Sequence, residues 1–149
     1  MACPLFIPSS PLGDFVPIAP PLGDLYGGDC AADPSAVIAP DTLRRYCNFG
    51  YARGHCERAD QSEADAARFL IKGERGGLVE IAWATERNHH PVAVGAVEVV
   101  TMEIGPGQAA PASHADVLTR QAHACAEAYV RQSSGRPADK RRMSGHAHP

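Results

Sequence analysis

The sequence predicts an α+β fold in which a three-stranded antiparallel β-meander packs against one long helix near the carboxyl end. Three apolar segments with hairpin-length connections indicate the meander, and one amphipathic segment follows them. With 149 residues, the chain has about the length of one domain. Three parts are expected along the chain: a proline-rich arm over 1–40, an α+β domain over 41–132 and a basic flexible tail over 133–149. The domain is divided into a helical cysteine-containing module over 41–67, the meander over 68–102 and the helix over 113–132.

The proline-rich arm, residues 1–40, is expected to wrap over the rest of the domain. Eight of the thirteen prolines fall in it, and proline fixes φ and removes a backbone donor. This density excludes regular helix and central strand and favours extended or turning backbone. The arm also contains spaced apolar side chains, which a solvated linker usually lacks. We therefore expect an ordered segment that lies over the domain or over a partner.

Two short helices are expected in the helical module. The first, over 42–48, follows Pro40, a residue that is typical of a helix start. The second, over 62–67, is expected because Ser62 and Asp65 have the spacing of a capping box.

The meander is expected to have three strands, over 68–72, 78–85 and 92–102. Val79, Ile81 and Trp83 alternate with smaller or polar residues, and this pattern places one face of the middle strand in the core. Hairpin-length connections between consecutive strands favour antiparallel pairing.

One long helix is expected over 115–132, after a Gly/Pro/Ala-rich loop over 105–112. Four residues at helical spacing form an apolar stripe that would cover the meander: Leu118, Ala122, Cys125 and Tyr129. The tail that follows carries four basic residues and one aspartate but no core-forming residue, so we expect it to be frayed.

Composition excludes several classes of protein. Hydrophobic residues make up 44% and charged residues 21% of the chain, as in an ordinary globular protein. No apolar run approaches the roughly 18 residues of a membrane span, and a net charge of -3 argues against a dedicated nucleic-acid binder. The start of the chain lacks the basic and apolar regions of a secretory signal, so a cytoplasmic location is expected. No nucleophile can be paired with a general base, which argues against an enzyme.

The five cysteines are the main chemical resource of the sequence. Cys125 falls on the apolar stripe of the long helix, where a free cysteine acts as a small hydrophobe. The other four lie in loop or helix-end contexts with 26, 16 and 8 residues between them: Cys3, Cys30, Cys47 and Cys56. In a reducing compartment, such cysteines more often bind metal than form disulfides. These four are the candidate ligands, and His55 is a possible substitute.

Four thiolates are the ligand set of both a structural zinc site and a cubane 4Fe-4S iron-sulfur cluster. Structural zinc sites usually take ligands in close pairs and iron-sulfur sites often use short cysteine runs; neither is present here, so the wide spacing weakens both assignments. The pair Cys3-Pro4 resembles the proline beside cluster ligands in bacterial ferredoxins, and Phe49 and Tyr51 would shield a cluster from water. The cluster is therefore the preferred cofactor, and zinc is the alternative.

Three functions follow from these alternatives. The first is a small iron-sulfur protein for electron transfer, or an accessory subunit of a redox complex. The second is a structural zinc-binding module for protein interaction, in which Trp83 and the sheet edge would meet the partner. The third is a metal-free scaffold or complex subunit that docks through its proline-rich arm, since four unrelated buried thiols also fit the composition. Each function implies a protein partner.

Overall fold

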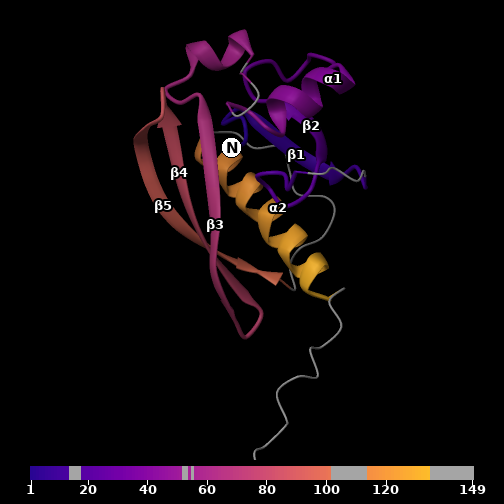
Figure 1. Ribbon diagram of the computed structural model, residues 1–149, viewed down its shortest axis with the longest axis vertical. Helices are drawn as coiled ribbons and strands as arrows, with labels where there is room; N and C mark the ends of the chain where they lie inside the picture. The colour runs from indigo at the N-terminus through magenta and orange to yellow at the C-terminus, as the bar shows by residue number, and fades with distance from the viewer. Residues whose placement is uncertain (14–17, 52–53, 55, 102–113, 135–149) are drawn as a thin grey trace, which may run out of the picture.

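The three-stranded sheet and the long helix form the body of the molecule (Figure 1). The computed structural model describes all residues except 14–17, 52–53, 55, 102–113 and 135–149. The sheet has the antiparallel order β3-β4-β5, with strands β3 (Ala66–Arg75), β4 (Leu78–Arg87) and β5 (His90–Val100). The predicted α+β meander is confirmed, and its strands run closer to the turns than the sequence pattern indicated.

Tight turns allow the strands to be this long. Asn88 and His89, between β4 and β5, have φ values of 49° and 66°, and Gly76 and Gly77, between β3 and β4, have φ values of 58° and 82°. Positive φ at both central positions is the geometry of a two-residue turn that matches the twist of the flanking strands.

One face of the sheet is buried against helix α2 (His114–Ser134). Val79 and Ile81 of β4 and Val99 of β5 are fully buried and pack in one cluster with α2. The helix contributes small residues to this cluster: Ala122, Cys125 and Ala126. The predicted alternation in β4 is therefore confirmed, and Cys125 is a core residue as expected.

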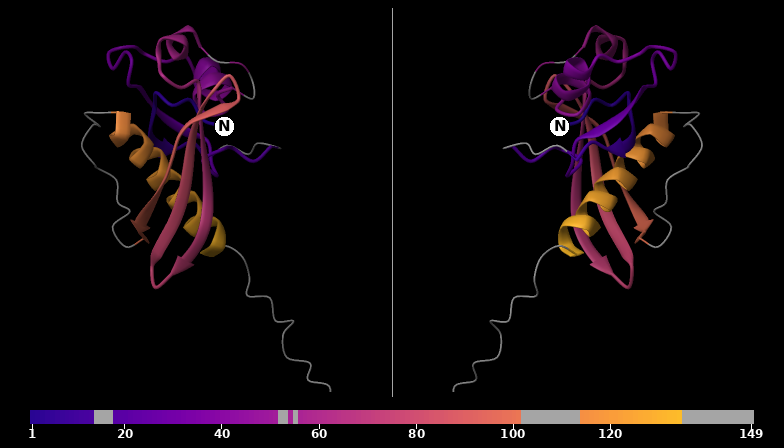
Figure 2. Two further views of the ribbon diagram at one scale, coloured as in Figure 1. Left: turned by 90° about the vertical axis from the view of Figure 1, so that its left-hand side faces the viewer. Right: turned by 90° about the vertical axis from the view of Figure 1, so that its right-hand side faces the viewer.

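The proline-rich arm packs on another side of α2. It contains the antiparallel strands β1 (Phe6–Pro11) and β2 (Tyr26–Cys30). Phe6, Leu22 and Tyr26 form a second buried cluster with Ala124 of α2. Figures 1 and 2 show α2 running obliquely between this ribbon and the three-stranded sheet. Both strands of a two-stranded ribbon are edges, which is why the prolines of β1 are tolerated.

The helical module contains short helices of three kinds. The expected first helix is present as α1 (Pro40–Thr42) followed by the π-helix η1 (Leu43–Cys47). A 3-10 helix, η2 (Glu57–Gln61), comes next.

The prediction of a helix over 62–67 is wrong, because its supposed capping residues have other partners. The Ser62 hydroxyl oxygen accepts a hydrogen bond from the Ala64 amide at 3.2 Å. The Asp65 carboxylate accepts one from the Asn88 amide at 2.9 Å, which fixes the hairpin turn, and β3 begins at Ala66.

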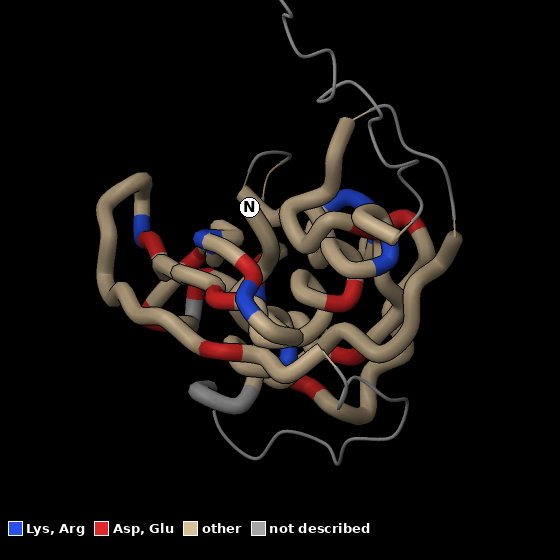
Figure 3. The backbone as a smooth tube through the Cα atoms, turned by 90° about the horizontal axis from the view of Figure 1, so that it is seen from below, with Lys and Arg blue, Asp and Glu red and all other residues tan. Residues whose placement is uncertain are grey.

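Basic and acidic residues are interspersed along the described backbone (Figure 3). Among the described residues, no helix is both long and apolar enough to cross a bilayer. The expected loop over 105–112 and all but the first two residues of the expected tail lie outside the described part of the chain.

Candidate metal centre

All four candidate ligands line one small cavity. Its volume is about 20 Å³, and Cys3, Cys30, Cys47 and Cys56 reach it from four separate segments. The first three of these residues are buried and Cys56 is half-buried. The other lining residues are Leu5, Phe6, Asp29, Ile38, Thr42 and Arg58. Figures 1 and 2 show the segments concerned, the N-terminus, β1, β2 and α1, gathered near one end of α2.

Backbone hydrogen bonds hold Cys3 in place. Ala2 exchanges two of them with Ala67 of β3, each 2.8 Å long, and the Cys3 amide donates to the Cys47 carbonyl oxygen at 3.0 Å. Gly50 allows the first residues to approach this closely. Its φ is 48°, and a Cβ atom there would lie 2.8 Å from the Met1 carbonyl oxygen. The start of the chain is thereby joined both to the sheet and to a second candidate ligand.

Gln121 of α2 supports the same turn from the other side. It is fully buried, and its side-chain amide nitrogen donates to the carbonyl oxygens of Cys3 and Phe6, both at 2.7 Å. A polar residue on the buried face of a helix needs such partners, because an unpaired buried amide is costly. Sequence reasoning missed this residue, although a glutamine three residues after Leu118 of the apolar stripe was a usable signal.

Cys30 and Cys47 each lie at the end of an element. Cys30 ends β2 opposite Phe6 and is followed by a turn in which the Asp33 amide donates to the Cys30 carbonyl oxygen at 3.1 Å. Cys47 ends η1. The next residue, Asn48, is fully buried and joins η1 to β2: its side chain accepts from the Tyr26 amide and donates to the Tyr26 and Leu43 carbonyl oxygens.

Cys56 has extended backbone immediately before η2, which is tied to the sheet. The Arg87 guanidinium of β4 donates to the carbonyl oxygens of Ala59 and Asp60 at 3.2 and 2.9 Å. Cys56 is the candidate ligand on the solvent side of the cavity. The proposed substitute ligand, His55, lies outside the described residues.

Burial raises the pKa of the Cys3 thiol to about 12, and the nearby Cys56 and Cys30 sulfurs add to the shift. Burial likewise raises the pKa of Cys47 to about 12, with further contributions from the other three candidate ligands, while the charge of Arg58 acts in the opposite direction. The sulfurs are thus close enough to interact electrostatically. A metal would bind the thiolate forms and would release protons as it bound.

The described part of the chain holds no group of three or more His, Cys, Asp or Glu side chains already arranged to hold a metal ion. A cavity of about 20 Å³ has room for roughly one water molecule. The four thiols therefore share a site, and they would have to reorient to complete a coordination shell.

The apolar shield of the cavity differs from the one expected. Leu5, Phe6 and Ile38 line it. Tyr51 instead makes an edge-to-face contact with His89, with ring centroids 4.2 Å apart. The β1 segment of the arm supplies the aromatic ring that was expected from Phe49 and Tyr51.

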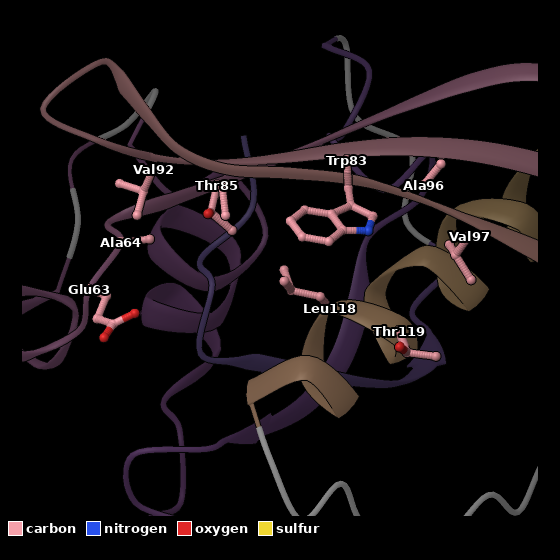
Figure 4. A pocket seen from close by; sticks show the side chains of 10 residues that line it. Glu63, Ala64, Trp83, Thr85, Val92, Ala96, Val97, Leu118 and Thr119 are labelled. Atoms are coloured by element: carbon pink, nitrogen blue, oxygen red, sulfur yellow. The ribbon is translucent and has the colours of Figure 1, made fainter.

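A second cavity, of about 380 Å³, contains the only tryptophan of the chain. Figure 4 shows the Trp83 ring of β4 facing Leu118 of α2, with Glu63 toward one end and Thr119 toward the other. This volume lies within the usual range for ligand pockets. Val92, Ala93, Ala96 and Val97 of β5 line part of the cavity, and Val92 and Val94 of the same strand are exposed.

Comparison with known proteins finds no matching family model, no matching curated protein and no matching solved structure. The function is therefore inferred from the geometry and chemistry of the site.

Proposed function

We propose that this chain is a small iron-sulfur protein whose 4Fe-4S cluster is bound by Cys3, Cys30, Cys47 and Cys56. The observation that carries the proposal is that these four thiols, from four separate segments, line one cavity. Four cysteine thiolates are the ligand set of such a cluster. Its activity would be electron transfer, either to a protein partner or as an accessory subunit of a redox complex.

The spacing of the cysteines does not separate the cluster from zinc, because both kinds of site usually take ligands in closer runs, and the nearest two cysteines here have 8 residues between them. Partial exposure of Cys56 favours the cluster, because it would place one edge of the centre near solvent, where a partner can approach, while the other three ligands are buried.

Metal analysis of the full chain tests the proposal. Protein purified without oxygen, or reconstituted with ferrous iron and sulfide, is expected to be brown and to contain iron and acid-labile sulfide in equal amounts. Dithionite should bleach the visible absorption. A colourless protein with one equivalent of zinc would overturn the iron-sulfur assignment, and a folded chain that binds neither metal would overturn the metal centre.

The second candidate is a zinc-stabilised module for protein interaction. The cavity beside Trp83, together with the exposed Val92 and Val94 on the neighbouring strand, favours this function. Strand addition along β5 would let a peptide place a side chain in the cavity. Zinc content combined with a change in Trp83 fluorescence on adding a partner would support this function instead.

A further inference from the structure

The cavity beside Trp83 owes its shape to small residues on the neighbouring strand. Trp83 and Thr85 are two residues apart on β4, so their side chains point to the same face of the sheet, the face that α2 covers. Opposite them on β5 lie Gly95 and Ala93. A Cβ atom at Gly95 would lie 2.4 Å from the indole ring, so the glycine lets the ring lie over β5. The cavity remains between the ring and Leu118 of α2 (Figure 4).

Thr85 brings a polar group without a protein partner to this cavity. The residue is 3% exposed and lines the cavity, and in Figure 4 its hydroxyl oxygen lies on the side toward Glu63. Within the described part of the chain, no hydrogen bond joins this hydroxyl to another residue. Most buried hydroxyls have a partner, and an unpaired one is costly. Since Thr85 is almost entirely buried, its hydroxyl can meet a partner only inside the cavity.

Glu63 is the only ionisable residue among those that line the cavity. It lies toward one end, where its side chain is exposed and makes no ion pair with the other described residues (Figure 4). The middle of the cavity is apolar, because Trp83 and Leu118 form it. A carboxylate attracts a cation, and so does the face of an indole ring, whereas both repel an anion. The lining therefore favours a ligand that combines a positive charge with an apolar body.

We propose that this cavity binds a small organic amine, with its ammonium group at the Glu63 and Thr85 end and its apolar body between Trp83 and Leu118. An ammonium group has three donors, so it can serve the carboxylate and the hydroxyl together. The volume of about 380 Å³ suits a compact aromatic amine. This cavity shares no lining residue with the cysteine cavity, so the proposal does not depend on the metal centre.

Titration of the full chain with phenethylamine, followed by tryptophan emission, tests the proposal. Trp83 is the only tryptophan of the chain, so its emission reports on this cavity alone. Phenethylamine, which is protonated at neutral pH, is expected to give a saturable shift. Phenethyl alcohol, which has a hydroxyl in place of the ammonium group, should bind roughly fivefold more weakly. Hydrocinnamate should bind more weakly still, because its carboxylate is repelled by Glu63.

Two variants test the position of the ammonium group. Glu63→Gln is expected to weaken phenethylamine binding roughly fivefold and to leave the binding of phenethyl alcohol unchanged. Thr85→Val keeps the shape of the side chain and should weaken phenethylamine binding by a similar factor, because it removes the hydroxyl. Glu98→Gln is the matched control and should bind as the wild type does, since Glu98 is exposed on β5 and does not line the cavity.

The outcomes are distinct. If none of the three compounds gives saturable binding by emission or by calorimetry, the site is overturned. Equal affinities for the amine and the alcohol, or equal losses in Glu63→Gln and Glu98→Gln, would overturn the assignment to an amine. Glu63→Gln changes an exposed side chain and should fold normally, so it decides the question even if Thr85→Val does not fold. Iron and sulfide contents test the proposed function separately.

Discussion

The side-chain amide of Gln121 lies 2.7 Å from the carbonyl oxygen of Cys3, although 118 positions separate the two residues in the sequence. The same nitrogen also donates to Phe6. The long helix therefore holds the turn that carries the first candidate ligand.

Removing this donor should loosen the turn. Gln121→Leu removes the side-chain donor from the Phe6 carbonyl oxygen and leaves the Cys3 carbonyl oxygen with only the Phe6 amide, 3.1 Å away. It is expected to lower the free energy of unfolding by about 1–3 kcal/mol. Gln132→Leu is the control, because Gln132 makes a similar bond to the Gly23 carbonyl oxygen at an exposed position, and the expected change is within about 0.5 kcal/mol. Urea unfolding measures both, and equal losses would contradict the role given to Gln121.

Each candidate ligand should be required for metal binding. Replacing Cys3, Cys30, Cys47 or Cys56 singly with serine is expected to reduce bound metal and sulfide sharply, because serine is a poor ligand for the proposed cluster. Cys125→Ser should keep the wild-type metal content, since Cys125 packs against the sheet. Elemental analysis of the five purified variants gives the comparison. Full occupancy in Cys3→Ser would remove the arm from the ligand set.

Gly50 should be more sensitive to substitution than a glycine with open space around it. Gly50→Ala meets a positive φ and the Met1 carbonyl oxygen, whereas Gly76→Ala meets only a positive φ, with no neighbouring atom within 4 Å. The backbone conformation alone should cost about 1–2 kcal/mol at either position. Gly50→Ala is expected to lose more stability than Gly76→Ala. Only Gly50→Ala is also expected to have a lower metal content. Thermal unfolding and metal analysis test this, and equal behaviour of the two variants would contradict it.

The buried Cys125 thiol predicts a pH dependence of stability. Burial raises its pKa from 9.0 to about 11. The pKa of Cys125 is higher in the folded state than in the unfolded state. The contribution of its buried neutral thiol to the free energy of unfolding is therefore complete below pH 9.0 and is lost as the pH rises through about 11. The free energy of unfolding of the wild type should therefore fall by on the order of 2 kcal/mol more than that of Cys125→Ala over this pH range. Thermal unfolding of both proteins at several pH values measures the difference in their stability. A difference that stays the same at every pH would contradict a raised pKa for Cys125.

Trp83 should report on the packing around its cavity. A Cβ atom on Gly95, the cross-strand partner of Trp83, would lie 2.4 Å from the indole ring. Gly95→Ala is therefore expected to displace the ring and shift the emission of this single tryptophan. Gly73→Ala places its Cβ atom in open space and should leave the emission unchanged. A spectrum that is the same in both variants would contradict this arrangement.

Local sequence patterns predicted the meander and the long helix because their periodicities report which face is buried. Val79 and Ile81 alternate along β4, and Cys125 follows the helical stripe. The helix expected over 62–67 failed because Asp65 bonds to the Asn88 amide, a partner 23 residues away that no local pattern contains.

Ligand count and loop context predict the four cysteines as candidate ligands, whereas their convergence on one cavity depends on contacts between distant segments. The bonds that Ala2 makes to Ala67, and Gln121 to Cys3, leave no signature in local spacing. The polar position of Gln121 within an apolar helix face pointed to a buried partner without identifying it. Metal identity cannot be predicted from spacing alone, because zinc and a cluster accept the same thiolates.

The placement of Cys3 has a consequence for biosynthesis. A chain is made from its amino end, and its first residues leave the ribosome long before its last ones. Cys3 emerges before the sheet strand that pairs with Ala2 and before the helix that holds the Cys3 turn. Gln121 is translated 118 residues after Cys3. A complete site for the proposed centre would therefore form only after Gln121 has been made, and the Cys3 thiol would have to stay reduced until then.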